Sequence, residues 1–126
     1  KRFLLEIHQE LVETLPVPLI LHICGKTIDR MPYIAESGMA AFHFDSKNDP
    51  QEAMNAVDGK INLAGNINNP ETLYSKGVSD VKQEVFKALD AGVQLIAPEC
   101  AIPLKTKIEN LLAIPEAVEE WTLKKH

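Results

Sequence analysis

The 126-residue sequence has no long hydrophobic run, no excess of positive charge and only two cysteines. A membrane-spanning helix needs about 20 consecutive apolar residues. No stretch approaches that length, and no signal-peptide pattern is visible. The formal net charge is −5, with acidic and basic residues interspersed, which argues against nucleic acid and membranes as partners. We therefore predict a cytoplasmic protein.

The two cysteines, Cys24 and Cys100, leave three interpretations open: a disulfide, two ordinary buried thiols, or a metal-binding or catalytic pair. The disulfide is the least favoured because the sequence lacks a secretory signal. His22 stands two residues before Cys24, at the end of an apolar run. Imidazole and thiolate are both common metal ligands in proteins, so this pair favours the third interpretation.

Hydrophobic periodicity and turn residues predict alternating helices and strands. The composition, 45% hydrophobic and 25% charged, suits a single unit over residues 1–126. The predicted helices cover 1–15, 27–37, 50–58, a short segment from 69, 79–91, and 106–121 in two pieces divided by Pro115. The predicted strands cover 17–23, 40–44, 61–67 and 93–99, the first of them buried on both faces. Asp49, Asn69 and Thr106 are the predicted N-terminal caps.

Four strand–helix units in strict alternation predict an α/β fold with one parallel sheet. No Gly-x-Gly-x-x-Gly follows any strand, so a dinucleotide-binding sheet lacks support. A closed (β/α)8 TIM barrel needs about 200 residues or more, so four units amount to half of one. Because the sequence begins at Lys1 and not at Met, we expect it to be part of something longer.

Reactive side chains end all four predicted strands: His22 and Cys24 the first, Asp45 the second, Asn66 the third and Cys100 the fourth. Residues two apart on a strand point to the same side, so His22 and Cys24 face one point. If the strand before Cys100 lies nearby, one imidazole and two thiolates converge. Such a set is typical of a zinc site with a vacant fourth position, and catalytic residues lie at this end of barrel strands.

The segment Phe42-His43-Phe44-Asp45 alternates between apolar and polar residues. If Phe42 and Phe44 pack under the outer helices, His43 and Asp45 share the opposite face. Asp45 then points into the barrel mouth, beside the metal. For His43 itself we predict a polar core histidine with its hydrogen bonds satisfied.

These motifs resemble a known family, the methylcobalamin:coenzyme M methyltransferases of the uroporphyrinogen decarboxylase-like superfamily of (β/α)8 barrels. The resemblance rests on His-x-Cys followed much later by Cys, and it covers the whole chain. The segments that carry it are 19–26, 42–46, 63–67 and 97–111. It implies that the chain is the C-terminal half of such a barrel.

The resemblance implies that His22, Cys24 and Cys100 bind Zn²⁺, and that the thiol of coenzyme M takes the fourth position. The thiolate would attack the methyl group of methylcobalamin, carried by a corrinoid protein, in methanogenesis. Asp45 would orient His22 or take the fourth zinc position when substrate is absent; a loop or capping aspartate is the alternative. Asn66 would contact corrinoid or substrate, or bond to loop backbone.

The resemblance also bears on Glu99, Lys105 and Lys107. Glu99 stands where the family commonly has a small residue, and it either alters the local field or faces out. Lys105 and Lys107 lie near a predicted helix start, where they would attract the sulfonate of coenzyme M. A solvated surface is the simpler account of the two lysines.

Two other functions stay open at the level of sequence. One is a related corrinoid methyltransferase with a different thiol acceptor such as homocysteine, because a zinc triad activates thiols in general. The other is a non-catalytic fragment that self-associates through its open strand edges. We expect the isolated chain to form an oligomer, for example a homodimer. The missing N-terminal half of the barrel is the other expected partner.

Overall fold

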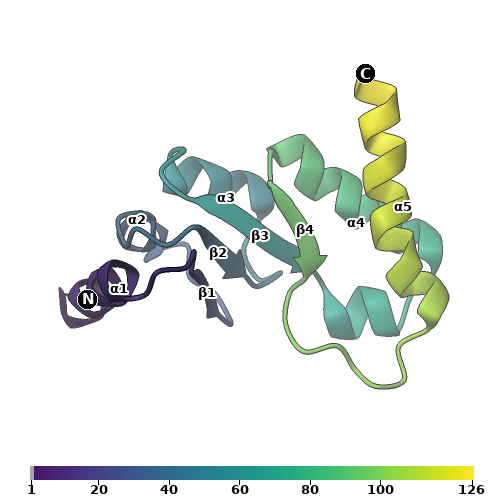
Figure 1. The fold of residues 1–126 in the computed structure, drawn as a ribbon. Helices are drawn as coiled ribbons and strands as arrows, with labels where there is room; N and C mark the ends of the chain where they lie inside the picture. The colour runs from purple at the N-terminus through teal and green to yellow at the C-terminus, as the bar shows by residue number, and fades with distance from the viewer. Residues whose placement is uncertain (1) are drawn as a thin grey trace.

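The computed structural model, shown in Figure 1, describes residues 2–126. The elements follow in the order α1 (Arg2–Thr14), β1 (Ile20–Ile23), α2 (Met31–Ala35), β2 (Ala41–Phe44), α3 (Pro50–Val57), β3 (Asn62–Ile67), η1 (Asn69–Tyr74, a π-helical segment), α4 (Val78–Ala91), β4 (Leu95–Pro98) and α5 (Ile108–Lys125). Within the described residues, no helix has the length and hydrophobicity needed to cross a membrane.

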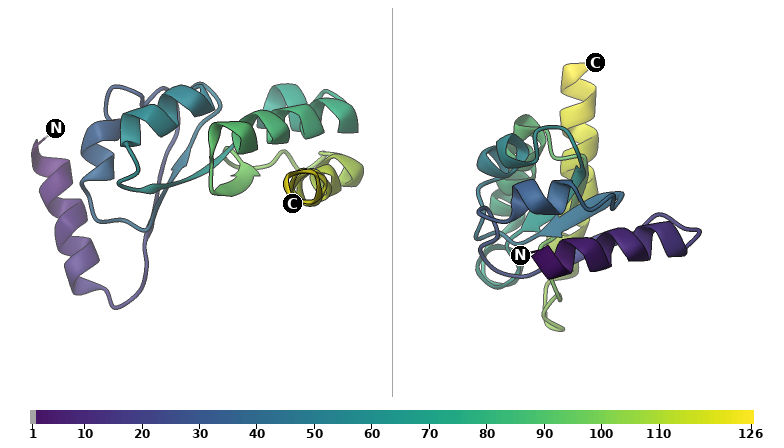
Figure 2. Two further views of the ribbon diagram at one scale, coloured as in Figure 1. Left: turned by 90° about the horizontal axis from the view of Figure 1, so that it is seen from above. Right: turned by 90° about the vertical axis from the view of Figure 1, so that its left-hand side faces the viewer.

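The four strands form one parallel sheet in the order β1-β2-β3-β4. Helices α2, α3 and α4 lie along one face of the sheet, while α1 and α5 lie at its two ends (Figures 1 and 2). Sequential parallel strands with helices on one side are the arrangement of a (β/α) barrel. The predicted α/β fold with four strand–helix units is therefore confirmed.

The hydrophobic core lies between the sheet and its helices. Phe42 and Phe44 of β2 are fully buried and pack in one cluster with Met31, Val57 and Leu63. A second cluster joins β3 to α4 and α5, and its members are Ile67, Leu73, Val81, Val85, Ala113, Ile114 and Ala117. The predicted packing of both phenylalanines under the helices is confirmed.

The prediction that the first strand is buried on both faces is wrong. Ile20 on β1 is 61% exposed, and Leu95 on β4 is 49% exposed. These two strands are the outer ones, and each has only one strand neighbour among the described residues. The sequence of a parallel strand is typically a continuous apolar run because helices or strands cover both of its faces. In this chain the outer strands are only partly covered.

The segment predicted as a helix over 27–37 is helical only from Met31 to Ala35. Pro32 sets where the helix begins, because proline is favoured in the first turn and disfavours helical backbone before it. The preceding residues instead form turns, closed by hydrogen bonds from the N–H groups of Arg30 and Met31 to the carbonyl of Thr27.

Pro115 does not divide the last helix, contrary to the prediction, since α5 runs unbroken from Ile108 to Lys125. The buried residues Ala113, Ile114 and Ala117 on either side of Pro115 belong to the second core cluster, and this packing holds the helix together across the proline. Thr106 does not cap α5 either: the capping position is Lys107, and the Thr106 hydroxyl is buried without a partner.

Capping is as predicted at α3 and displaced by one residue at η1. The Asp49 carboxylate accepts hydrogen bonds from the N–H groups of Gln51 and Glu52. At η1 the cap is Asn68, whose side chain accepts from the Glu71 N–H. Asn69, the predicted cap, is therefore free for another role, described below.

Gly65 on β3 is required by a close backbone approach. Its φ is +134°, and a Cβ at this position would lie 2.6 Å from the carbonyl oxygen of Phe44. We expect Gly65→Ala to lower the free energy of unfolding by about 2–6 kcal/mol, from about 1–3 kcal/mol of backbone strain plus about 1–3 kcal/mol of overlap. Gly59→Ala is the control, because Gly59 also has positive φ (+70°) but nothing within 4 Å. Urea denaturation giving equal losses for the two variants would contradict this account.

Candidate metal site

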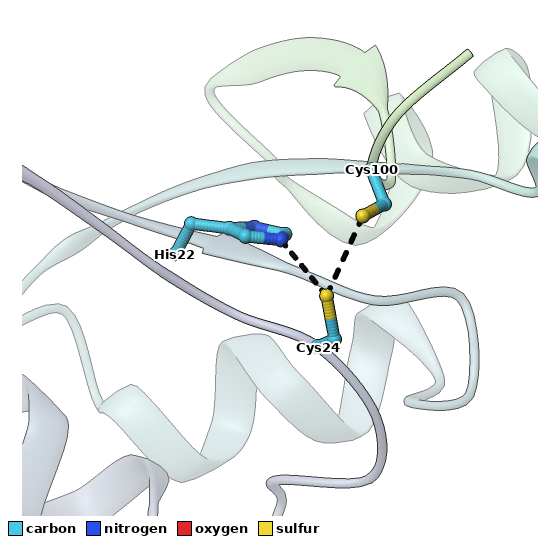
Figure 3. Close-up of side chains that lie close together, drawn as sticks. All are labelled: His22, Cys24 and Cys100. Carbon is cyan, nitrogen blue, oxygen red and sulfur yellow. Dashed lines mark hydrogen bonds between the residues drawn. The ribbon is translucent and has the colours of Figure 1, made fainter.

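Three side chains from the two outer strands meet at the carboxyl edge of the sheet (Figure 3). His22 lies on β1, Cys24 follows the end of β1, and Cys100 follows β4. His22 Nε2 is 3.1 Å from Cys24 Sγ, which is 3.4 Å from Cys100 Sγ, and the three ligand atoms lie within 4.8 Å of one another. The structure thus brings together the three residues that the sequence pointed to as metal ligands.

The short distance between the cysteines reflects the curvature of the sheet. Neighbouring strands are about 4.8 Å apart, so in a flat sheet the first and fourth strands would be separated by about 14 Å. A separation of 3.4 Å between Cys24 Sγ and Cys100 Sγ requires inward-pointing side chains on a curved sheet. This is the geometry of a barrel mouth.

The ring of His22 is held with one nitrogen turned toward the thiols. Its Nδ1–H donates a hydrogen bond to the backbone carbonyl of His43, at 3.1 Å. Because a carbonyl only accepts, the proton lies on Nδ1 and Nε2 keeps its lone pair for a metal. His43 itself is tied down, since its Nε2–H donates to the carbonyl of Pro98 at 2.7 Å. The predicted satisfied polar histidine at position 43 is what the structure shows.

Both thiols are free and exposed, which removes the interpretation as two ordinary buried cysteines. The hydrogen bond with Cys100, followed by partial desolvation and the nearby negative charges of Asp45 and Glu99, raises the pKa of the Cys24 thiol. A metal ion reverses this effect, because a coordinating thiol is deprotonated. The pair is therefore better suited to a bound cation than to an isolated thiolate.

Asp45 organises the loop that follows β2. Its Oδ2 accepts from the Gly25 N–H at 2.8 Å and its Oδ1 from the Lys47 N–H at 2.9 Å. Partial burial opposes ionisation, but these hydrogen bonds outweigh it and lower the pKa of Asp45. The His22 ring is oriented by the His43 carbonyl and not by Asp45, so the structure favours the loop role among those predicted. Occupation of the fourth zinc position by Asp45 stays a prediction.

Asn66 bonds to loop backbone, the alternative that the sequence left open for it. Its Nδ2 donates to the carbonyl of Asn48 at 2.8 Å, and the side chain is buried, with 6% exposed. Asn48 in turn accepts from the Thr27 N–H and donates to the Gly25 carbonyl. Contact of Asn66 with a corrinoid stays a prediction. Its observed contact joins β3 to the loop after β2, and Asn48 joins that loop to the one after β1.

Glu99 points inward, so of the two alternatives that the sequence left open for it, the one in which it faces out is wrong. The side chain is 6% exposed. Its Oε2 accepts from the Ser46 N–H at 2.7 Å and its Oε1 from the Asn69 N–H at 3.0 Å. Sequence reasoning missed both this role and that of Asn69, because neither residue belongs to a ligand motif. Lys105 and Lys107 are both exposed, as the solvated-surface account expects.

The residues present fit a divalent zinc ion. One imidazole nitrogen with its tautomer fixed and two thiols are ligands that zinc prefers, and the exposure of all three leaves a side open to a further ligand. The described residues contain no second group of three such side chains within this range.

Comparison with known proteins supports the fold and the family resemblance. Residues 1–121 match the family described as uroporphyrinogen decarboxylase (URO-D). The chain belongs to this family. It is 32% identical, over 81% of its length, to the methylcobamide:CoM methyltransferase MtaA of Methanosarcina barkeri. It is 26% identical, over its whole length, to the methylated-thiol–coenzyme M methyltransferase of Methanosarcina mazei.

The structural comparison points to the same group of proteins. A solved methyltransferase from Methanosarcina mazei superposes with a TM-score of 0.91 at 27% sequence identity, over 96% of this chain. The chain spans about a third of the length of these relatives: 30% of the first, 34% of the second and 36% of the solved structure.

Proposed function

We propose that this chain carries the zinc site of a methyltransferase that moves a methyl group from a corrinoid to a thiol. The observation that carries the proposal is the convergence of His22 Nε2, Cys24 Sγ and Cys100 Sγ within 4.8 Å at the carboxyl ends of parallel strands. Relatives named as methylcobamide:CoM methyltransferases support it.

In this proposal His22, Cys24 and Cys100 hold Zn²⁺, and the open side admits the substrate sulfur. Zinc would supply one thing, deprotonation of the incoming thiol at neutral pH, and the thiolate is the reactive nucleophile. The carbonyl of His43 holds the His22 ring so that Nε2 faces the thiols. Asp45, through the Gly25 N–H, fixes the backbone that follows Cys24.

We propose coenzyme M as the thiol and methylcobalamin, on a corrinoid protein, as the methyl donor, which would place the reaction in methanogenesis. Three names among the relatives include coenzyme M as a reactant, and this supports the choice over homocysteine. We further propose that residues 1–126 form one unit, the C-terminal half of a barrel in the cytoplasm.

A methyl-transfer assay on the protein, purified at the full length that the cell produces, tests this function. We expect methylcobalamin to be demethylated with coenzyme M and much more slowly with homocysteine. Removal of zinc by a chelator should reduce the rate at least a hundredfold, and added Zn²⁺ should restore it. Equal rates with both thiols would assign the chain to the alternative class of acceptor, and a rate that is unaffected by chelation would contradict the zinc site.

In this proposal the other half of the barrel would cover surfaces that this chain leaves exposed. The exposed apolar residues include Ile20, Leu95, Leu104, Ile108 and Leu112. We therefore expect residues 1–126 alone to self-associate. Light scattering should then give a molar mass above the 14.0 kDa of one chain. Addition of the missing part should replace self-association by a one-to-one complex; a clean monomer of the isolated chain would contradict this prediction.

A further inference from the structure

The irregular segment that carries Cys100 is tied to the neighbouring loops by two side chains, Glu99 and Asn69. Glu99 is the last residue before Cys100, and its N–H continues the strand ladder by donating to the carbonyl of Ile67 at 2.9 Å. Beyond Cys100, the chain has no helix or strand until α5 begins at Ile108. The position of the Cys100 thiol therefore depends on contacts that regular secondary structure does not supply.

The Glu99 carboxylate joins three loops at once. Its two oxygens accept from the Ser46 N–H, in the loop after β2, and from the Asn69 N–H, at the start of η1. The side chain is 6% exposed, so water competes little for these hydrogen bonds. Each oxygen meets a backbone N–H donor, and only a carboxylate can accept on both sides.

Asn69 bonds directly to the backbone of the Cys100 segment. Its Nδ2 donates to the carbonyl of Cys100 at 2.8 Å and to the carbonyl of Ala101 at 2.9 Å. Asn69 is 2% exposed. The buried side-chain amide of Asn69 thus bonds to the backbone of Cys100, while the backbone N–H of Asn69 donates to Glu99.

We propose that Glu99 and Asn69 are positioning residues that set the place of the Cys100 thiolate in the metal site. They act through Cys100 and not through the metal, because both Glu99 oxygens and the Asn69 Nδ2 are bonded to backbone groups. This inference rests on the proposed zinc function. Groups around a metal ligand commonly change metal affinity 10–100-fold when they are removed, and we expect a loss in that range for each residue.

The chain offers a matched control in Glu84. Its carboxylate also bonds to the loop after β3, accepting from the Asn68 N–H at 3.1 Å and from the Thr72 hydroxyl at 3.3 Å, but it makes no bond to the Cys100 segment. A glutamine at position 84 keeps both contacts, since the Thr72 hydroxyl can accept as well as donate. A glutamine at position 99 has only one acceptor oxygen, so its NH₂ group must face a backbone N–H and one of the two hydrogen bonds is lost.

The test measures zinc affinity by competition with a chelator in the full-length protein and its variants. We expect Glu99→Gln and Asn69→Ser each to bind zinc 10–100-fold more weakly, and Glu84→Gln to stay within twofold of wild type. In a Cys100→Ser background, Glu99→Gln and Asn69→Ser should each have no further effect, because the ligand through which they act is gone. A purely structural role would give the same loss in both backgrounds.

The outcomes separate the two proposals. A wild-type protein that binds no zinc contradicts the zinc function and, with it, this inference. If the wild-type protein binds zinc and the affinities of Glu99→Gln and Asn69→Ser lie within twofold of it, the zinc function stands and the positioning role is overturned. If Glu99→Gln does not fold, as judged by circular dichroism, Asn69→Ser decides the question by the same comparison.

Discussion

Replacement of either cysteine by alanine is expected to weaken zinc binding by a factor of about 60 to 700. The binding free energy of zinc sites with four protein ligands is about 10–16 kcal/mol, so one ligand accounts for about 2.5–4 kcal/mol. In the proposed site Cys24 and Cys100 would be the two sulfur donors, and His22 Nε2, within 4.8 Å of them, would be the nitrogen donor. Zinc per chain after dialysis against a chelator of known affinity measures the loss.

The same change in a residue outside the cluster provides the control. His126 is exposed at the end of the chain, so His126→Ala should retain the full zinc content, while His22→Ala should lose it as the cysteine variants do. Cys24→Ser and Cys100→Ser keep the size of the side chain and separate loss of the ligand from loss of packing. Normal zinc content in both cysteine variants would remove the proposed site.

Zinc affinity is expected to fall steeply with decreasing pH, by up to about a hundredfold per pH unit. A metal ion binds thiolates and must displace their protons, and two thiols release two protons. The ordinary pKa of a cysteine is about 8.5, and the hydrogen bond with Cys100 raises the pKa of Cys24 further. The Cys24 thiol therefore keeps its proton at neutral pH in the metal-free protein.

The direction of this dependence follows from that protonation. Lower pH favours the metal-free, protonated form, so the apparent affinity should drop between pH 8 and pH 6. Calorimetry in buffers of different ionisation enthalpy counts the protons, and we expect about two per zinc at pH 7. A count near zero would mean that thiolates are not the ligands.

The fold and the convergence of His22, Cys24 and Cys100 could be predicted from the sequence because both depend on local patterns. Strand–helix alternation gives a parallel sheet, and the spacing of His22 and Cys24 places them on the same side of a strand. The partner Cys100 follows from its place after the fourth strand. These features need only the period of each element and the rule that the carboxyl ends of parallel strands meet at one edge.

The groups that hold those ligands in place could not be predicted from the sequence. The carbonyl that orients His22 belongs to the backbone of His43, and a backbone carbonyl leaves no mark in the choice of residue. The Glu99 carboxylate meets N–H groups 53 and 30 residues away, which depends on how the loops fold over the sheet. Pro115 shows the converse, since tertiary packing preserved a helix that local propensity would break.

The central claim, a zinc ion held by His22, Cys24 and Cys100 with room for a substrate thiol, is tested most directly by X-ray absorption at the zinc edge of the full-length protein. We predict one nitrogen and two sulfur ligands from the protein, with a further sulfur ligand after coenzyme M is added. A protein without zinc, a shell without sulfur, or a shell that does not change on addition of the thiol would contradict the account.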